Sequence, residues 1–378
     1  MRPILALILV ASLAGCGGGS KTTSTAQQPT SDGLVVGAVE DAAKGGDAQA
    51  QMNLAAGSGF GAIALSAVWE QGQRAPSAAD LRALKAASAA AVKAKIRPIV
   101  AVYQFSANTP AMPDQRAAFA AYSAALVQAL PDVHDVIVGN EPNLNLFWMP
   151  QFDSSGGDAA AASFEQLLAA TYDAVKKVRD DVQVIGVGVS PRGSDDASSS
   201  RPTHSPTRFL LDLGAAYRAS GRKEPIMDAL AMHPYGESPH VPPTLAHPNT
   251  TSLGIADYHR LVDLLGRAFD GTGQKGRTLP IVYGEYGVET TIPPAKQSLY
   301  QGHEVVKTVD EATQADYYVK AIHLAACQST VELLLLFHVN DEPKLEGLQS
   351  GVRYADGSAK SSLARVRDAA RSPECAQK

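Results

Sequence analysis

Eight short apolar runs recur along the chain, and a segment with helical periodicity follows each of them. We interpret the apolar runs as strands, and they are Leu34–Val39, Ala62–Leu65, Ile96–Tyr103, Val133–Val138, Val182–Val187, Ile226–Met232, Leu279–Tyr283 and Val331–Phe337. Strands that are buried on both faces read as continuous apolar runs, which is typical of a parallel sheet covered by helices. The pattern therefore predicts an α/β protein.

The predicted helices fill the gaps between these strands. They are Ala48–Ala56, Ala78–Ala94, Gln115–Leu130, Ala159–Arg179, Thr207–Ala219, Ala256–Phe269, Asp310–Ala326 and Ser361–Ala370. Eight strand–helix units are the number found in a TIM (β/α)8 barrel. A doubly wound open sheet is the alternative, but its glycine-rich phosphate turn after the first strand has no counterpart at Gly37–Glu40. We therefore predict a single-domain TIM barrel over residues 33–378.

The first residues have the pattern of an export signal. Arg2 precedes an apolar stretch that is too short for a stable membrane span. Residues 13–16 (LAGC) resemble the bacterial lipoprotein lipobox, which implies that residues 1–15 are removed and that Cys16 is lipidated. Residues 16–32 are rich in Gly, Ser, Thr and Gln and predict a flexible tether. We expect an extracytoplasmic lipoprotein anchored to a membrane of a bacterial cell envelope; an ordinary secretory signal is the alternative.

Two more cysteines, Cys327 and Cys375, lie near the C-terminal end of the sequence. Disulfides persist outside the cytoplasm, so an exported chain can join these two residues. Such a bond would tie the C-terminal tail to a late helix. Two unrelated thiols are the alternative, because the spacing of two cysteines does not establish a pairing.

Charge and histidine placement exclude several classes of partner. The formal net charge is −5 and no long basic run occurs, which argues against nucleic acid. The sequence has neither a His-x-x-x-His motif nor a cluster of cysteine and histidine, so we expect no catalytic metal. The absence of a Gly-x-Ser-x-Gly motif disfavours a serine hydrolase. We expect no cofactor, and we expect a monomer.

Two glutamates follow glycines at the ends of apolar runs. Glu141 comes after the fourth strand and Glu285 comes after the seventh. The carboxyl ends of barrel strands carry the chemistry of this fold, and strands four and seven approach the mouth from roughly opposite sides. Two carboxyl groups facing one another can cleave a glycosidic bond, with about 5–5.5 Å between them in retaining enzymes and about 6.5–9.5 Å in inverting ones.

The motifs around these glutamates resemble those of the clan A glycoside hydrolases, which are retaining (β/α)8 enzymes that include cellulases, mannanases and xylosidases. The resemblance lies in Asn-Glu-Pro at residues 140–142 and in Gly-Glu at residues 284–285. It implies that Glu141 is the general acid/base and that Glu285 is the nucleophile. It also implies that Asn140 binds the sugar 2-hydroxyl beside the scissile bond.

Further residues near the strand ends are candidates for substrate binding. His233 and Tyr235 match a histidine and a tyrosine after strand six of many clan members, where the tyrosine hydroxyl orients the nucleophile. Many members end strand eight with a tryptophan, whereas this chain has Phe337 and His338, so His338 is the candidate at that depth. The aromatic residues that we consider for stacking on sugar rings are Trp69, Tyr103 and Trp148.

The sequence therefore predicts a retaining glycoside hydrolase that acts by double displacement on a β-linked glycan or oligosaccharide. The alternative is a non-catalytic envelope lipoprotein that binds a glycan or another solute. A solute receptor has two lobes, and the chain shows no second lobe. A degenerate barrel would more often have lost one of the two carboxylates, and both are present.

Overall fold

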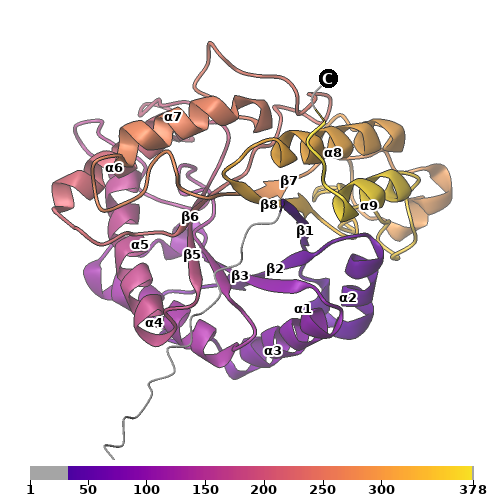
Figure 1. Ribbon diagram of the computed structural model, residues 1–378, viewed down its shortest axis with the longest axis horizontal. Helices are drawn as coiled ribbons and strands as arrows, with labels where there is room; N and C mark the ends of the chain where they lie inside the picture. The colour runs from indigo at the N-terminus through magenta and orange to yellow at the C-terminus, as the bar shows by residue number, and fades with distance from the viewer. Residues whose placement is uncertain (1–32, 377–378) are drawn as a thin grey trace, which may run out of the picture. The chain divides into compact units, whose positions relative to one another are not determined.

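Within residues 33–376, which are the residues that the computed structural model describes, eight parallel strands close into a barrel (Figure 1). The strands are β1 (Val35–Val39), β2 (Ala62–Val68), β3 (Arg97–Tyr103), β4 (Asp135–Val138), β5 (Gln183–Val189), β6 (Ala229–Met232), β7 (Ile281–Tyr286) and β8 (Val331–Phe337). Each strand pairs with its neighbours in chain order, and β8 pairs with β1 to complete the ring. The predicted TIM barrel is confirmed.

Small and branched apolar side chains fill the inside of the barrel. They come from alternate positions of the strands and include Ala62, Ala64, Ile99, Ile137, Ile185, Ala229, Ala231, Val282, Leu333 and Leu335. Gly37 of β1 faces this crowded interior, where a Cβ atom would lie 2.8 Å from the Leu335 side chain and 2.5 Å from a β2 carbonyl oxygen. The interior is therefore a packed core, and ligands can enter only at its ends.

Helices surround the strands and bury their outer faces. They are α1 (Ala42–Gly45), α2 (Ala48–Gly57), α3 (Ala78–Lys93), α4 (Pro113–Ala129), α5 (Ala159–Val178), α6 (Pro206–Ser220), α7 (Tyr258–Phe269), α8 (Glu311–Ala326) and α9 (Leu363–Arg371), with short 3-10 turns η1 (Ser106–Asn108), η2 (Ile255–Asp257) and η3 (Pro294–Leu299). The Ser77 hydroxyl accepts a hydrogen bond from the Asp80 amide and caps α3, which confirms the predicted start of that helix.

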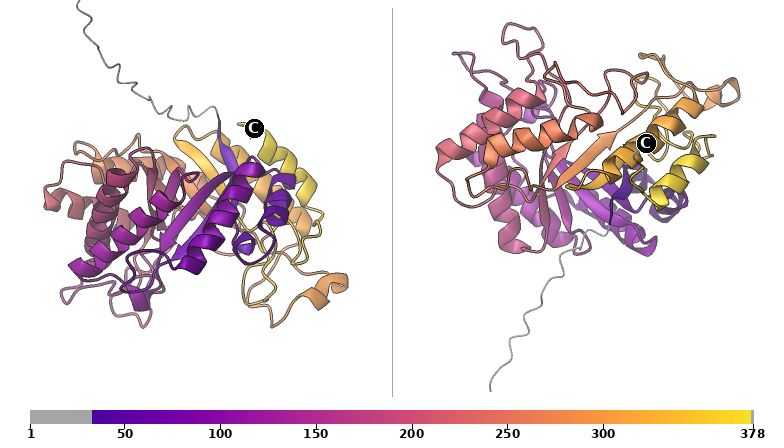
Figure 2. Two further views of the ribbon diagram at one scale, coloured as in Figure 1. Left: turned by 90° about the horizontal axis from the view of Figure 1, so that it is seen from below. Right: turned by 45° about the horizontal axis from the view of Figure 1, so that its top comes forward.

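Long loops gather at the carboxyl ends of the strands. The segments after β4, β5, β6, β7 and β8 each exceed ten residues before the next α-helix, whereas the connections from helix back to strand are mostly shorter. The orange segment between β7 and α8, which contains η3, extends beyond the ring of helices in the left view of Figure 2. Loops of this length build a wall around the barrel mouth, where (β/α)8 proteins carry their functional residues.

At the opposite end of the barrel, a disulfide ties the C-terminal tail to α8. Cys327 at the end of α8 and Cys375 are joined by a disulfide. Among residues 33–376, no helix is long and apolar enough to cross a membrane. The predicted signal peptide, the lipidation site at Cys16 and the tether over residues 16–32 lie outside the described residues.

Candidate active site

Glu141 lies on a tight turn that follows β4. The backbone turns through Gly139 at φ +96° and Glu141 at φ +42°, a left-handed region that non-glycine residues seldom occupy. The Glu141 amide donates to the Gly188 carbonyl of the neighbouring strand at 2.8 Å, which fixes this turn to β5. Backbone strain of this kind is stored where the surrounding structure holds a functional side chain in place.

The side chain of Asn143 secures the same turn from behind. It is fully buried; its oxygen accepts from the Ser190 amide at 2.9 Å, and its amide group donates to the His204 carbonyl at 2.9 Å. Through these bonds, the loop after β4 and the loop after β5 form one unit. The second asparagine of the Asn-Glu-Pro-Asn motif is thus structural, and it positions Glu141 indirectly.

Glu285 belongs to β7 itself and faces the mouth of the barrel. The Tyr235 hydroxyl, from the loop after β6, donates to its Oε2 at 3.1 Å. Burial raises the pKa of Glu285, and the negative charge of Glu141 adds to this effect, whereas the His233 ring and the Tyr235 hydroxyl oppose it. The tyrosine therefore stabilises the ionised form of a carboxyl group that burial makes harder to ionise.

His233 lies between the two glutamates and connects them. Its Nδ1 atom is 3.2 Å from Oε1 of Glu141 and 3.7 Å from Oε2 of Glu285. Because both oxygens lie near one nitrogen, they are at most about 7 Å apart, which includes the retaining separation and only the lower edge of the inverting range. Burial lowers the pKa of His233, but the two carboxylates outweigh burial, and the net shift is upward.

Two glycines leave room for the His233 ring. A Cβ atom on Gly284 would lie 3.2 Å from the ring, and one on Gly188 would lie 3.2 Å from its Nε2 atom. Gly188 also has a positive φ of +62°, which follows the bulge of β5 against β6. A side chain at the glycine before Glu285 would thus press on the ring that contacts both carboxyl groups.

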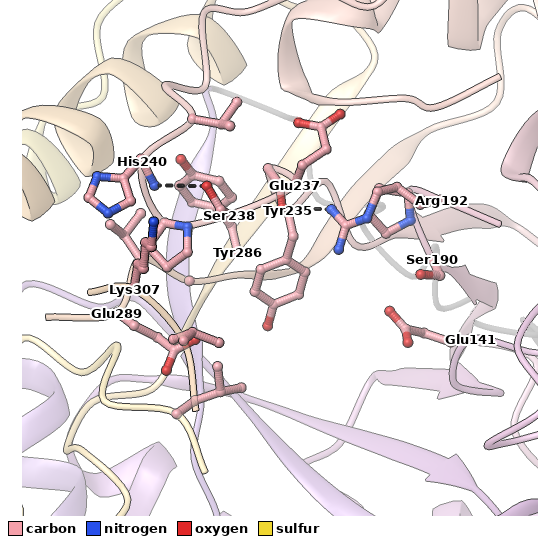
Figure 3. A pocket seen from close by; sticks show the side chains of 18 of the residues that line it. Glu141, Ser190, Arg192, Tyr235, Glu237, Ser238, His240, Tyr286, Glu289 and Lys307 are labelled. Carbon is pink, nitrogen blue, oxygen red and sulfur yellow. Dashed lines mark hydrogen bonds between the residues drawn. The ribbon is translucent and has the colours of Figure 1, made fainter. Parts of the chain in front are cut away.

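A cavity of about 450 Å³ opens beside this group of residues (Figure 3). Glu141, Tyr235 and Arg192 point toward a common space in this view, and the Arg192 guanidinium donates to the Gly236 carbonyl at 2.6 Å. A cavity of this size is within the usual range for small-molecule sites, about 300–1,000 Å³. The loops after β4, β5, β6, β7 and β8 all contribute to its wall.

Three solved structures of glycoside hydrolases share this barrel. The β-glycosidase BGL167 superposes with a TM-score of 0.55 and 17% identity, covering 88% of this chain and 87% of its own. A GH5_18 protein from Streptomyces cattleya, in complex with Manβ1-4GlcNAc, gives 0.59 and 14%, covering 89% and 80%. A Bacteroidetes-affiliated GH5 cellulase gives 0.57 and 13%, covering 91% and 93%. No family model and no curated protein matches the chain. At these identities the likeness shows the common fold.

The two tryptophans predicted to stack on sugars do not reach the cavity, so these predictions are wrong. Trp148 is completely buried, donates from Nε1 to the Ser163 hydroxyl at 2.9 Å and packs edge-on against Phe164. Trp69 is also completely buried, donates to the Gln73 carbonyl and packs edge-on against a ring of α4. Both rings anchor loops to helices, where an amphipathic indole satisfies its N–H while burying its faces.

The remaining predicted residues lie at the mouth of the barrel. Asn140 is half-buried next to Glu141, and its side chain makes no hydrogen bond to the rest of residues 33–376. Tyr103 is half-buried at the end of β3, and the charge of Glu285 contributes to the rise in its pKa, after burial. His338 donates from Nδ1 to the Val39 carbonyl at 2.8 Å and lowers the pKa of Glu285. Substrate contact by these residues stays a prediction.

Sequence reasoning missed several residues of the mouth. Phe105 is 45% exposed, and its ring stacks on Phe147 and meets Tyr103 edge-on, so an aromatic cluster lies where the tryptophans were expected. Arg192 and Glu289 line the cavity from the loops after β5 and β7. Neither belongs to a recognisable motif, and only their places after strand ends could have indicated them.

Proposed function

We propose that the protein is a retaining glycoside hydrolase that cleaves a β-linked glycan or oligosaccharide. The observation that carries this proposal is the position of His233 Nδ1 beside both carboxyl groups, which holds Glu141 and Glu285 within about 7 Å across the mouth. The glycoside hydrolases that share the barrel support the proposal, as do the Asn-Glu-Pro and Gly-Glu motifs at the matching strand ends.

In the first step, Glu141 carries the proton and Glu285 is ionised. Glu141 gives its proton to the glycosidic oxygen while an oxygen of Glu285 attacks the anomeric carbon, so that the leaving group departs as an alcohol. The sugar is then bound to Glu285 as an ester, and its negative charge is gone. Nδ1 of His233 faces both carboxyl groups, and with a proton on this atom it stabilises the negative charge on whichever of them is ionised.

In the second step, Glu141 is ionised and accepts a proton from a water molecule. The water oxygen attacks the anomeric carbon, the bond to Glu285 breaks, and Glu285 regains its negative charge. The hydroxyl of Tyr235 donates to Glu285 throughout and makes the carboxylate a better leaving group by favouring its ionised form. Two inversions at the same carbon restore the original configuration.

The test uses two variants and a matched control. Glu285→Gln is expected to abolish turnover of aryl β-glucosides and β-mannosides, which we choose because the solved barrels include a cellulase and a complex with Manβ1-4GlcNAc. Glu141→Ala is expected to lose activity that azide partly restores as a glycosyl azide of retained configuration. The control is Glu224→Gln, an exposed glutamate between α6 and β6 with no ion pair among residues 33–376. Full activity of either site variant overturns the roles.

Export and lipid anchoring are part of the proposal. The supporting feature is the lipobox-like run that ends at Cys16. Full-length protein expressed in a bacterial host is expected to incorporate labelled fatty acid and to partition into the detergent phase, whereas Cys16→Ser is expected to do neither. Equal labelling of both proteins would exclude Cys16 as the lipidated residue, and labelling of neither would favour the secretory alternative.

A further inference from the structure

The cavity beside Glu141 has a second wall that the proposed reaction does not use. This wall is formed by the segment between β7 and α8 and by the loop after β8. Its lining residues are Val288, Glu289, Val306, Lys307 and Leu348. Three apolar side chains beside a carboxyl group and an amine can contact both the C–H groups and the hydroxyl groups of a sugar, and a small number of placed polar groups is what fixes a ligand in such a pocket.

Glu289 is the buried acidic residue of this wall. Glu289 is only 7% exposed, yet it lines the cavity. Among residues 33–376, no lysine, arginine or histidine pairs with its carboxyl group, and no side chain donates a hydrogen bond to it. Apart from the Gln349 backbone amide, which lowers its pKa, this carboxyl group keeps free capacity for hydrogen bonds, which a ligand in the cavity can use.

The surroundings of Glu289 favour its protonated form. Burial raises the pKa of Glu289 to about 7, the charges of Glu304, Glu342 and Asp341 add to the rise, and the backbone N–H of Gln349 opposes it. Lys307 shares the cavity wall, and Lys360 lies behind it, paired with Asp341. A protonated carboxyl group both donates and accepts hydrogen bonds. Sugar hydroxyl groups do the same, so the two match.

The backbone that carries Glu289 is firmly held. The Val309 amide donates to the Glu289 carbonyl at 3.0 Å, and the next residue, Thr290, bonds from its amide to the Gln349 carbonyl at 3.1 Å. Behind them, the fully buried Lys360 donates to the Thr290 hydroxyl at 2.6 Å. A binding residue on a supported backbone is pre-organised, which reduces the entropy lost when a ligand binds.

We propose that this wall is a subsite for a second sugar unit, next to the one that reacts, and that Glu289 binds its hydroxyl groups. The inference rests on the proposed glycosidase function and names a residue that determines which substrates the enzyme prefers. It predicts a preference for oligosaccharides over simple aryl glycosides, because only a longer substrate reaches both Glu141 and Glu289.

The experiment compares two substrates in the wild type, in Glu289→Ala and in Glu289→Gln. The substrates are an aryl monoglycoside and the β-1,4-linked trisaccharide of the same sugar. For Glu289→Ala we expect kcat/KM on the trisaccharide to fall about tenfold, mainly through KM, with a change of less than about twofold on the monoglycoside. Glu289→Gln is expected to stay within about threefold of the wild type on both substrates, because an amide also donates and accepts.

Three results would overturn the inference. One is an equal loss on both substrates in Glu289→Ala, which would indicate damage to the reacting site. Another is no loss on either substrate. The third is a loss in Glu289→Gln as large as in Glu289→Ala, which would mean that charge is required. Glu224→Gln is the control for both substrates.

Failure of the proposed function is distinguishable from failure of the inference. If the wild type hydrolyses no glycoside, the proposed function fails, and titration calorimetry with the unhydrolysed trisaccharide then tests the subsite. Tenfold weaker binding to Glu289→Ala than to the wild type supports the subsite in a glycan-binding protein. Equal binding to the two proteins, or binding to neither, overturns it.

Discussion

The two ends of the barrel both contain acidic residues, but they partner them differently. At the amino-terminal end, the Arg97 guanidinium forms a bidentate pair with Asp135, and the Gln183 amide donates to Glu332 at 2.8 Å. At the carboxyl end, Glu141 and Glu285 share one histidine, and no lysine or arginine pairs with either among residues 33–376.

The difference separates a structural role from a chemical one. A buried acid with a bidentate arginine forms a charge-assisted pair that holds neighbouring strands together. Two acids that share a histidine interact through one ring, and both of them raise the pKa of that histidine. If this comparison is correct, substitutions at the amino-terminal end change stability, and substitutions at the carboxyl end change turnover.

The largest effect is expected from Glu285→Gln, which should lower kcat by at least about a thousandfold through loss of the nucleophile. Stability should not fall. The folded protein raises the pKa of Glu285, so ionising this group costs stability above its unfolded-state pKa, and the neutral amide avoids that cost at pH 7. Urea denaturation at pH 7 and single-turnover kinetics measure both quantities. A less stable variant would contradict the comparison.

Asp135→Ala should have the opposite effect: a loss of stability with no change in kcat. Asp135 is 1% exposed, and its removal leaves Arg97 without its partner, so the free energy of unfolding is expected to fall by about 3 kcal/mol. The kcat of the remaining folded enzyme should be unchanged at low temperature. In the double variant Arg97→Ala/Asp135→Ala, the free energy of unfolding should fall by less than twice this amount, because no unpaired guanidinium remains. A fall in kcat parallel to the loss of stability would show that the two ends are energetically coupled and would contradict the comparison.

Removal of the disulfide is expected to act in the same way as Asp135→Ala. Cys375→Ser opens a link across 48 residues at the amino-terminal end, which should lower the free energy of unfolding by about 2–4 kcal/mol. Turnover by the folded variant should be unaffected. Urea unfolding of the oxidised wild type, the reduced wild type and the variant checks this, with the last two expected to agree.

The smallest effect is expected from Tyr235→Phe. Its hydroxyl donates to Glu285 and favours the ionised carboxylate, so its loss raises the pKa of Glu285 further. The nucleophile must be ionised, and activity falls as the pH drops below that pKa. We expect the acidic limb of the kcat/KM profile to move to higher pH, with about a tenfold loss at the optimum. An unmoved acidic limb would show that Tyr235 does not tune the nucleophile.

Most of the fold could be predicted from the sequence, because each strand is a short apolar run that ends close to where the structure ends it. β8 agrees at both ends, over Val331–Phe337. The glutamate pair could also be predicted, since both acids follow glycines at strand ends. Side chains that depend on distant partners could not. Trp148 is buried because Ser163 and Phe164 of α5 receive it, and no local pattern indicates that contact.

The close packing of two glycines against the His233 ring limits how this barrel can be redesigned. Gly188 and Gly284 leave room for the ring because they have no side chain, and even a methyl group at either position would press against it. Libraries that vary the loops to change specificity can therefore sample residues such as Glu289 freely, but they should keep these two glycines constant. Mutational tolerance at Gly188 and Gly284 is then limited by a buried imidazole ring that itself lines no part of the cavity.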